Sequence, residues 1–230
     1  MKPFRTAVDR IKQLDAESQW NHDTMLLKSL KVGLPSSFRY NISISHSKRF
    51  LWFRVAKVGT RSIFYHFQQN GVALDVVEAM WIHYPAAWLH KYFKFAFVRD
   101  PWDRLISCWR DKVVQRNYFR FEKSTREKMM DFGCFLGWVK QQDLANCDHH
   151  LCRQSRLIDL AQLDFLGRME RFESDFQLLC RELDLSTTTI PHQNQSQATL
   201  NSQSANLKDL YGEQVAALYR LDYQVFGYSY

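Results

Sequence analysis

The chain has 230 residues, of which 46% are hydrophobic, so it can bury the core of one sizeable domain and is not expected to be disordered. Its formal charge of +7 at neutral pH fits a site for a nucleotide or an acidic substrate, and the lack of a long Lys/Arg run argues against a nucleic-acid-binding protein. We find no apolar stretch of about 18 residues and no apolar segment near the start, so we expect neither a transmembrane segment nor a secretory signal.

The first part of the chain mixes charged and apolar residues, and it is expected to form a helical N-terminal extension over residues 1–45. Residues 46–230 are then the main domain. The apolar run at residues 50–55 (FLWFRV) predicts a buried strand. The periodicity of residues 61–69 predicts a helix, which ends at an Asn-Gly pair.

A second strand is predicted at residues 92–98 (YFKFAFV), and Asp100 followed by Pro101 is typical of a helix start, with the aspartate as N-cap. Further apolar segments indicate a strand at residues 165–166 and helices at 126–140, 172–183 and 207–218. Alternation of strands and helices predicts an α/β fold, namely a single P-loop-like domain with a central parallel sheet flanked by helices.

The segment that follows the first strand has the composition of an anion site. A strand–loop–helix connection points several unpaired backbone N–H groups at one place. Gly59 permits close approach of the backbone to an anion, Thr60 and Ser62 add hydroxyl groups, and Lys57 adds a positive charge. The GxxxxGK[ST] pattern of nucleoside triphosphatases is absent. An ordinary capped helix after a core strand is the alternative interpretation.

The second strand leads into another group of polar residues. Arg99 follows the strand, where α/β proteins place their ligands, and Ser107 lies about two helical turns further on. A guanidinium and a hydroxyl at this spacing fit one phosphate group. The alternative is that Arg99 pairs with Asp103 and that Ser107 has no special role.

Together the two segments resemble a known family. Residues 56–62 (AKVGTRS) resemble the 5′-phosphosulfate loop of sulfotransferases that use 3′-phosphoadenosine-5′-phosphosulfate (PAPS), and residues 97–107 (FVRDPWDRLIS) resemble their 3′-phosphate motif. The likeness, strongest to carbohydrate sulfotransferases of the heparan 2-O- and chondroitin/HNK-1 type, continues to the end of the chain. Four later segments carry it: 148–154 (DHHLCRQ, with Arg153 in place of a proline), 164–176 (DFLGRME…DF), 191–194 (PHQN) and 223–228 (YQVFGY, with Gln224-Val225 in place of an acidic-aromatic pair).

The resemblance implies PAPS as the donor, 3′-phosphoadenosine-5′-phosphate (PAP) as the product and a hydroxyl acceptor, with a carbohydrate expected. It implies that Lys57 stabilises the departing oxygen and that Arg99 and Ser107 bind the 3′-phosphate, while Arg104 either assists or pairs with a carboxylate. No metal is required, because cationic residues neutralise the donor. The residues implied to hold the 5′-phosphosulfate are Lys57, Val58, Gly59, Thr60, Arg61 and Ser62.

The acceptor hydroxyl needs a general base, and histidine suits this role near neutral pH. In the heparan 2-O-type relatives the base lies upstream of the second strand. His83 occupies that region here and is the first candidate, His150 is the second and His90 the third. For each of them, a packed or merely solvent-exposed side chain is the alternative.

The sequence also contains a group of cysteines and histidines and several tryptophans whose roles can be predicted. Cys147, His149, His150 and Cys152 resemble a metal cluster, but a structural zinc site needs a second ligand pair, so no metal is expected. Most of the seven tryptophans are expected in the core. Aromatic faces stack on both bases and sugars, so a few of them are candidates to line an adenine or sugar pocket, such as Trp81, Trp88 or Trp102, and the sequence does not choose among them.

Two rival functions remain at this point. A kinase-like transferase predicts ATP binding and magnesium dependence, and a non-catalytic binder of anionic glycans predicts binding without transfer. Lys57 at the position of the leaving oxygen favours catalysis. The five cysteines form no CxxC pair, which favours a cytoplasmic protein, with the catalytic domain of a membrane-anchored Golgi enzyme as the alternative. Neither the acceptor nor the oligomeric state is evident from the sequence.

Overall fold

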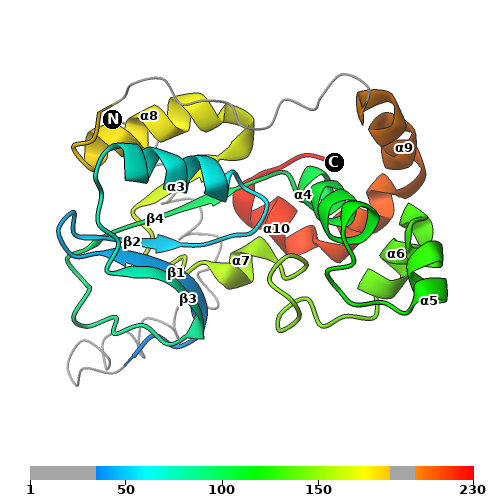
Figure 1. The fold of residues 1–230 in the computed structure, drawn as a ribbon, viewed down its shortest axis with the longest axis horizontal. Helices are drawn as coiled ribbons and strands as arrows, with labels where there is room; N and C mark the ends of the chain where they lie inside the picture. Colours follow the sequence, from blue (N-terminus) through cyan, green and yellow to red (C-terminus); the bar gives the residue numbers. More distant parts are fainter. Residues whose placement is uncertain (1–34, 187–199) are drawn as a thin grey trace. The chain divides into compact units, whose positions relative to one another are not determined.

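The computed structural model describes residues 35–186 and 200–230 (Figure 1). The predicted helical extension before residue 35 and the segment at 191–194 lie outside this range. Where the sequence predicts one domain, the chain divides into two compact units. Of the described residues, the first unit holds 35–98 together with 154–186, and the second holds 99–153 together with 200–230.

The first unit is built on a five-stranded sheet in the order β3-β1-β2-β4-β5. β2 pairs with β4 and β4 with β5 in parallel, whereas β1 is antiparallel to both of its neighbours. The α/β fold with a central sheet and flanking helices is therefore confirmed, although one inner strand runs against the parallel direction. The strands are β1 (Tyr40–Ser45), β2 (Phe50–Phe53), β3 (Val76–Ile82), β4 (Phe93–Val98) and β5 (Phe165–Arg168).

The centre of this sheet is aromatic and dry. All four residues of β2 and most of β4 are buried, as expected for strands covered on both faces. Trp52 stacks on Phe95 with ring centroids 5.7 Å apart, and Phe67 of the helix α3 (Thr60–Gln69) meets Phe95 edge to face. Phe176 of α8 (Phe172–Glu182) packs against Phe97. The short helix α7 (Gln154–Leu157) also belongs to this unit.

The expectation that a helical extension reaches residue 45 is wrong for residues 40–45, which form strand β1. All six residues of the strand are buried, although the sequence YNISIS alternates polar and apolar side chains. The two serines bond to backbone carbonyls of the same unit: the Ser43 hydroxyl donates to the carbonyl of Val77 in β3, and the Ser45 hydroxyl donates to that of Ala73, just before β3. Buried serines bonded to backbone carbonyls produce no hydrophobic signal in the sequence.

The second unit is helical. The single helix expected at 126–140 is two helices, because the Asp131 side chain accepts the N–H of Cys134 at 2.8 Å and caps a new helix. In the part of the chain that the structure describes, no helix is long and apolar enough to cross a membrane. The helices are α4 (Pro101–Trp109), the π-helix η1 (Arg110–Gln115), α5 (Lys123–Met129), α6 (Phe132–Val139), α9 (Leu200–Leu218) and α10 (Arg220–Phe226).

Candidate active site

The strand directions of the first unit place several candidate residues at one edge of the sheet. Because β1 is antiparallel to both β2 and β3, those two strands point the same way, as do β4 and β5. Their carboxyl ends share one edge, where open α/β sheets bind ligands. The 57–62 loop follows β2, and His83 follows β3. Since β1 separates these two strands, their axes lie roughly 10 Å apart.

The loop at 57–62, the candidate donor loop, has an uncommon backbone. Lys57 and Gly59 both have positive φ values, 71° and 79°. A left-handed lysine is unfavourable, and such conformations persist where the surrounding structure enforces them, often at functional sites. Gly59 is the N-cap of α3, with no side-chain cap, and its carbonyl accepts the N–H groups of Ser62 and Ile63. The N–H groups at the start of the helix lack intrahelical partners, which suits an anion.

Packing explains why glycine occupies position 59. A Cβ there would lie 3.1 Å from the Met169 sulfur and 3.1 Å from the Phe172 ring, both in the first unit. The side chain of Val58 is fully buried beneath the loop and anchors it. The buried Val58 side chain therefore anchors the backbone of the candidate donor loop, and the N-cap residue Gly59 places no side chain beside the first turn of α3.

The side chains of the loop are not equivalent. Arg61 is exposed, and Lys57 is half-buried. The Thr60 hydroxyl donates to the carbonyl of Val55 at 3.3 Å, and Ser62 is buried. Arg61 is thus the exposed cation of the loop and Lys57 a partly covered one, whereas the Thr60 hydroxyl is already bonded and Ser62 is buried.

In the second unit, the predicted helix start at Asp100 is confirmed. The Asp100 side chain accepts the N–H of Asp103 at 3.1 Å, with Pro101 as the first helical residue. Arg99 Nη2 lies 4.0 Å from Asp103 Oδ2, a loose contact that leaves its side chain 27% exposed. Ser107 is half-buried. The pKa of Arg110, the C-cap residue of α4, is lowered by burial, against the effect of Asp103, and Arg99 lowers it further.

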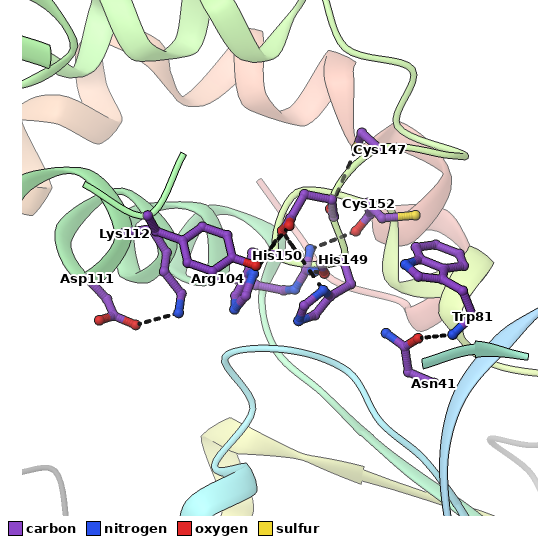
Figure 2. A network of polar contacts seen from close by, with 11 residues as sticks. Asn41, Trp81, Arg104, Asp111, Lys112, Cys147, His149, His150 and Cys152 are labelled. Atoms are coloured by element: carbon purple, nitrogen blue, oxygen red, sulfur yellow. Dashed lines mark hydrogen bonds and ion pairs between the residues drawn. The ribbon is translucent and has the colours of Figure 1, made fainter. Parts of the chain in front are cut away.

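The assignment of Arg104 to donor binding does not agree with its position. Its side chain is 2% exposed, and its guanidinium donates to the carbonyls of Cys152 at 3.0 Å and His149 at 2.8 Å. These bonds connect α4 to the segment at residues 148–152, all within the second unit (Figure 2). A guanidinium enclosed in this way stabilises a loop, and we leave Arg104 out of the donor contacts.

His83 is exposed, and its imidazole is oriented by the backbone of the same unit. Its Nδ1 lies 2.6 Å from the carbonyl oxygen of Ser36. Because a carbonyl only accepts, Nδ1 carries the proton and Nε2 is left as an acceptor, the form that a general base requires. His90 is also exposed, with its Nδ1 2.6 Å from the carbonyl of Ala87, in the loop before β4.

His150 belongs to a polar group in the second unit. Its Nδ1 lies 2.8 Å from Asp148 Oδ1, and Tyr118 donates its hydroxyl to the other oxygen of Asp148 at 3.0 Å. The His149 and His150 rings lie 4.1 Å apart (Figure 2). Lys112 lies over the Tyr118 ring at 4.4 Å. Asp148 thus fixes the His150 tautomer with Nε2 as the acceptor, but the His150 side chain is only 10% exposed.

The titration of this group follows from burial. Burial, reinforced by His150, lowers the pKa of His149 to about 4, and burial also lowers the pKa of His150 despite its bond to Asp148. For Asp148, burial acts to raise the pKa, but the hydrogen bonds from His150 outweigh it and the pKa falls below its usual range. Both histidines are therefore neutral at pH 7. Burial and Asp148 raise the pKa of Tyr118 to about 12.

The expectation that no metal binds near His149 and His150 stays a prediction. Asp148, His149 and His150 offer three possible ligand atoms within 4.8 Å of one another, so the structure groups Asp148 with the histidines. The sequence had grouped the histidines with Cys147 and Cys152. Asp148 was visible in the sequence as part of a motif, whereas Tyr118 carried no local signal, because it lies 30 residues away in the chain.

Comparison with known proteins identifies the relatives. A family model described as "Sulfotransferase family" matches residues 40–229. Carbohydrate sulfotransferase 10 of Xenopus laevis is 28% identical over 174 residues, covering 61% of this chain and 48% of that protein. Carbohydrate sulfotransferase 12 of Mus musculus is 28% identical over 171 residues, covering 61% and 41%. The chain matches less than half the length of these relatives. No solved structure matches significantly.

Proposed function

Because this chain belongs to the sulfotransferase family, we propose that it transfers a sulfuryl group from PAPS to a hydroxyl group of a carbohydrate. The observation that carries the proposal is the candidate donor loop, where two left-handed residues, Lys57 and Gly59, lead into the open N-terminus of α3. Backbone N–H groups beside a lysine fit a 5′-phosphosulfate. Relatives named carbohydrate sulfotransferases favour a sugar as the acceptor.

In the proposed donor complex, the first-turn backbone of α3 and Arg61 bind the 5′-phosphosulfate. Lys57 neutralises the charge that develops on the oxygen between phosphorus and sulfur. In the second unit, Arg99 and Ser107 are the proposed contacts of the 3′-phosphate, the group that distinguishes PAPS from ATP. A guanidinium binds a phosphate through two parallel charge-assisted hydrogen bonds, which a 4.0 Å contact with Asp103 does not provide.

The proposed reaction is a single displacement at sulfur. The acceptor oxygen forms a bond to sulfur while the bond from sulfur to the bridging phosphate oxygen breaks, so PAP leaves with the electron pair. The acceptor proton passes to a general base. These requirements are met by positioning and charge stabilisation, with no covalent enzyme intermediate.

We assign the base to His83. Its Nε2 is the free acceptor, its side chain is exposed, and it follows β3 at the sheet edge that also carries Lys57. His150 has the same tautomer, held by Asp148, but its side chain is largely enclosed. A substrate hydroxyl must come within about 3 Å of the base, so access favours His83.

The donor is tested by calorimetric titration with PAP, 5′-AMP and ATP. Wild-type protein is expected to bind PAP most tightly, and Arg99→Ala is expected to lose at least about tenfold in PAP affinity, the usual effect of removing a charged hydrogen bond. Arg116→Ala is the matched control, because it removes a 55% exposed guanidinium of the same unit. A folded wild-type protein that does not distinguish PAP from 5′-AMP would rule out PAPS as the donor.

The base is tested by comparing three histidine variants in a transfer assay. His83→Ala is expected to lose about 10²–10⁴-fold in turnover while keeping its PAP affinity, the range that general-base catalysis contributes. His90→Ala, which removes another exposed histidine of the first unit, is expected to keep full activity. Full activity in His83→Ala with loss in His150→Ala would transfer the role to His150.

A further inference from the structure

An arginine in the first unit is packed among aromatic rings. The guanidinium carbon of Arg156, from α7, lies 4.8 Å from the ring centroid of Phe38, 5.7 Å from that of Trp81 and 6.0 Å from that of Tyr40. Its Nη1 donates to the carbonyl of Arg39 at 3.1 Å. We call Phe38, Tyr40, Trp81 and Arg156 the Arg156 cluster. Its cation is held in a fixed position by its aromatic neighbours.

The cation in this cluster lacks an acidic partner. Within residues 35–186 and 200–230, no carboxylate lies within 4.0 Å of the Arg156 guanidinium. By contrast, Arg54 of the same unit pairs with Glu78 at 2.9 Å. A guanidinium has five N–H donors, and the bond to Arg39 uses one of them. A half-buried, oriented guanidinium with donors to spare is suited to an external anion.

The backbone at Trp81 is bent to present this indole. Trp81 has φ 52°, a left-handed conformation that is a genuine outlier for a bulky residue. The pairing of β1 with β3 is irregular between Tyr40 and Ile42, and the Trp81 N–H donates instead to the side chain of Asn41 at 2.8 Å (Figure 2). Bulges of this kind redirect side chains beside active sites. The Asn41 side chain, 1% exposed, holds the bent strand in place.

The cluster is linked through the chain to the proposed base. Trp81 lies two residues before His83, so the two Cα atoms are about 7 Å apart along the strand end. The carbonyl of Ser36, which orients the His83 ring, lies two residues before Phe38. The same two segments therefore carry the base and the three aromatic rings of the Arg156 cluster, and α7 supplies the arginine.

We propose that the Arg156 cluster binds an acidic sugar unit of the acceptor, with the guanidinium on its carboxylate or sulfate and an aromatic ring against the sugar ring. The inference rests on the proposed function and names its substrate class. It also selects among the three tryptophans left open by the sequence. Trp102 is 2% exposed in the core of the second unit, and Trp88 is 78% exposed, whereas Trp81 is half-buried beside a cation.

The test is calorimetric titration of the PAP-saturated protein with a uronic-acid-containing oligosaccharide, a sulfated neutral oligosaccharide and the carboxyl-reduced form of the first. Wild-type protein is expected to bind at least one of the two acidic probes, and the reduced probe at least about tenfold more weakly than its acidic parent if a carboxylate is recognised. Arg156→Ala is expected to lose about tenfold or more for the acidic probe that binds, and Arg156→Lys is expected to recover only part of it.

The controls separate this inference from the proposed function. Arg181→Ala removes an exposed arginine of the same unit and is expected to bind every probe as the wild type does. PAP affinity is expected to be unchanged in all Arg156 variants. Equal acidic-probe affinity in wild type and Arg156→Ala, or no binding of either acidic probe by the wild type, would overturn the inference. If the wild-type protein does not bind PAP, the proposed donor is overturned instead.

Discussion

Replacing Gly59 by alanine tests the candidate donor loop directly. An L-residue at φ 79° costs roughly 1–2 kcal/mol in backbone strain. The added Cβ would also lie 3.1 Å from both the Met169 sulfur and the Phe172 ring, so these neighbours must give by a few tenths of an ångström. We expect a total of about 2–3 kcal/mol, divided between lower stability and a displaced first turn of α3. Since 1.4 kcal/mol is tenfold, PAP affinity should fall about tenfold or more.

Gly71→Ala is the matched control. Gly71 also has a positive φ, 62°, but a Cβ there meets nothing within 4 Å. It lies after α3, at the opposite end of that helix from the candidate donor loop. Thermal unfolding of both variants, with calorimetric titration of PAP, separates strain from ligand binding. Both should lose stability, and only Gly59→Ala should lose PAP affinity. A folded Gly59→Ala protein with wild-type PAP affinity would show that this loop does not hold the donor.

Three further predictions concern stability. In Gly167→Ala the new Cβ would fall 2.2 Å from the Phe97 ring, so chemical denaturation should show a loss of about 1–3 kcal/mol or more, and an unchanged midpoint would contradict the packing of β4 on β5. Tyr84→Phe removes the buried 2.8 Å hydrogen bond to Asp159 and should lower the free energy of unfolding by about 1–3 kcal/mol in the same assay. An unchanged free energy of unfolding would show that water replaces the lost bond to the carboxylate. Burial lowers the pKa of His149 to about 4, so the unfolded chain binds a proton at this histidine before the folded protein does, and the free energy of unfolding decreases as the pH falls from 6.5 towards 4. In His149→Asn this decrease should be smaller. The same dependence of the free energy of unfolding on pH in both proteins would refute the prediction.

Local sequence patterns predicted the elements with a strong hydrophobic or capping signal. Strands β2 and β4 are continuous apolar runs because they are buried on both faces, and α4 begins where its aspartate and proline indicate. Strands β1 and β3 were missed. The serines of β1 are buried and bonded to the carbonyls of Val77 and Ala73, so they give no hydrophobic signal. β3 is a partly exposed edge strand with mixed composition.

The residues of the candidate site likewise differ in whether a local sequence pattern predicts their role. The order of its motifs and the chemistry of Lys57, Gly59 and Arg99 could be read from the sequence, because a glycine-containing turn between strand and helix defines an anion site locally. The burial of Arg104 could not be read in this way. An arginine in a helix has the same local sequence whether it binds a ligand or, as here, the carbonyls of a distant loop.

The sequence by itself determined the family and the α/β class and predicted the donor chemistry, since each depends on short segments whose residues are neighbours in the chain. Only the tertiary structure decided the orientation of His83 by Ser36, 47 residues away, and of His150 by a carboxylate shared with Tyr118. It also brought Arg156 to the backbone of Arg39, 117 residues away. Such contacts arise when strand pairing and helix packing bring remote segments together, and no local pattern of residues specifies them.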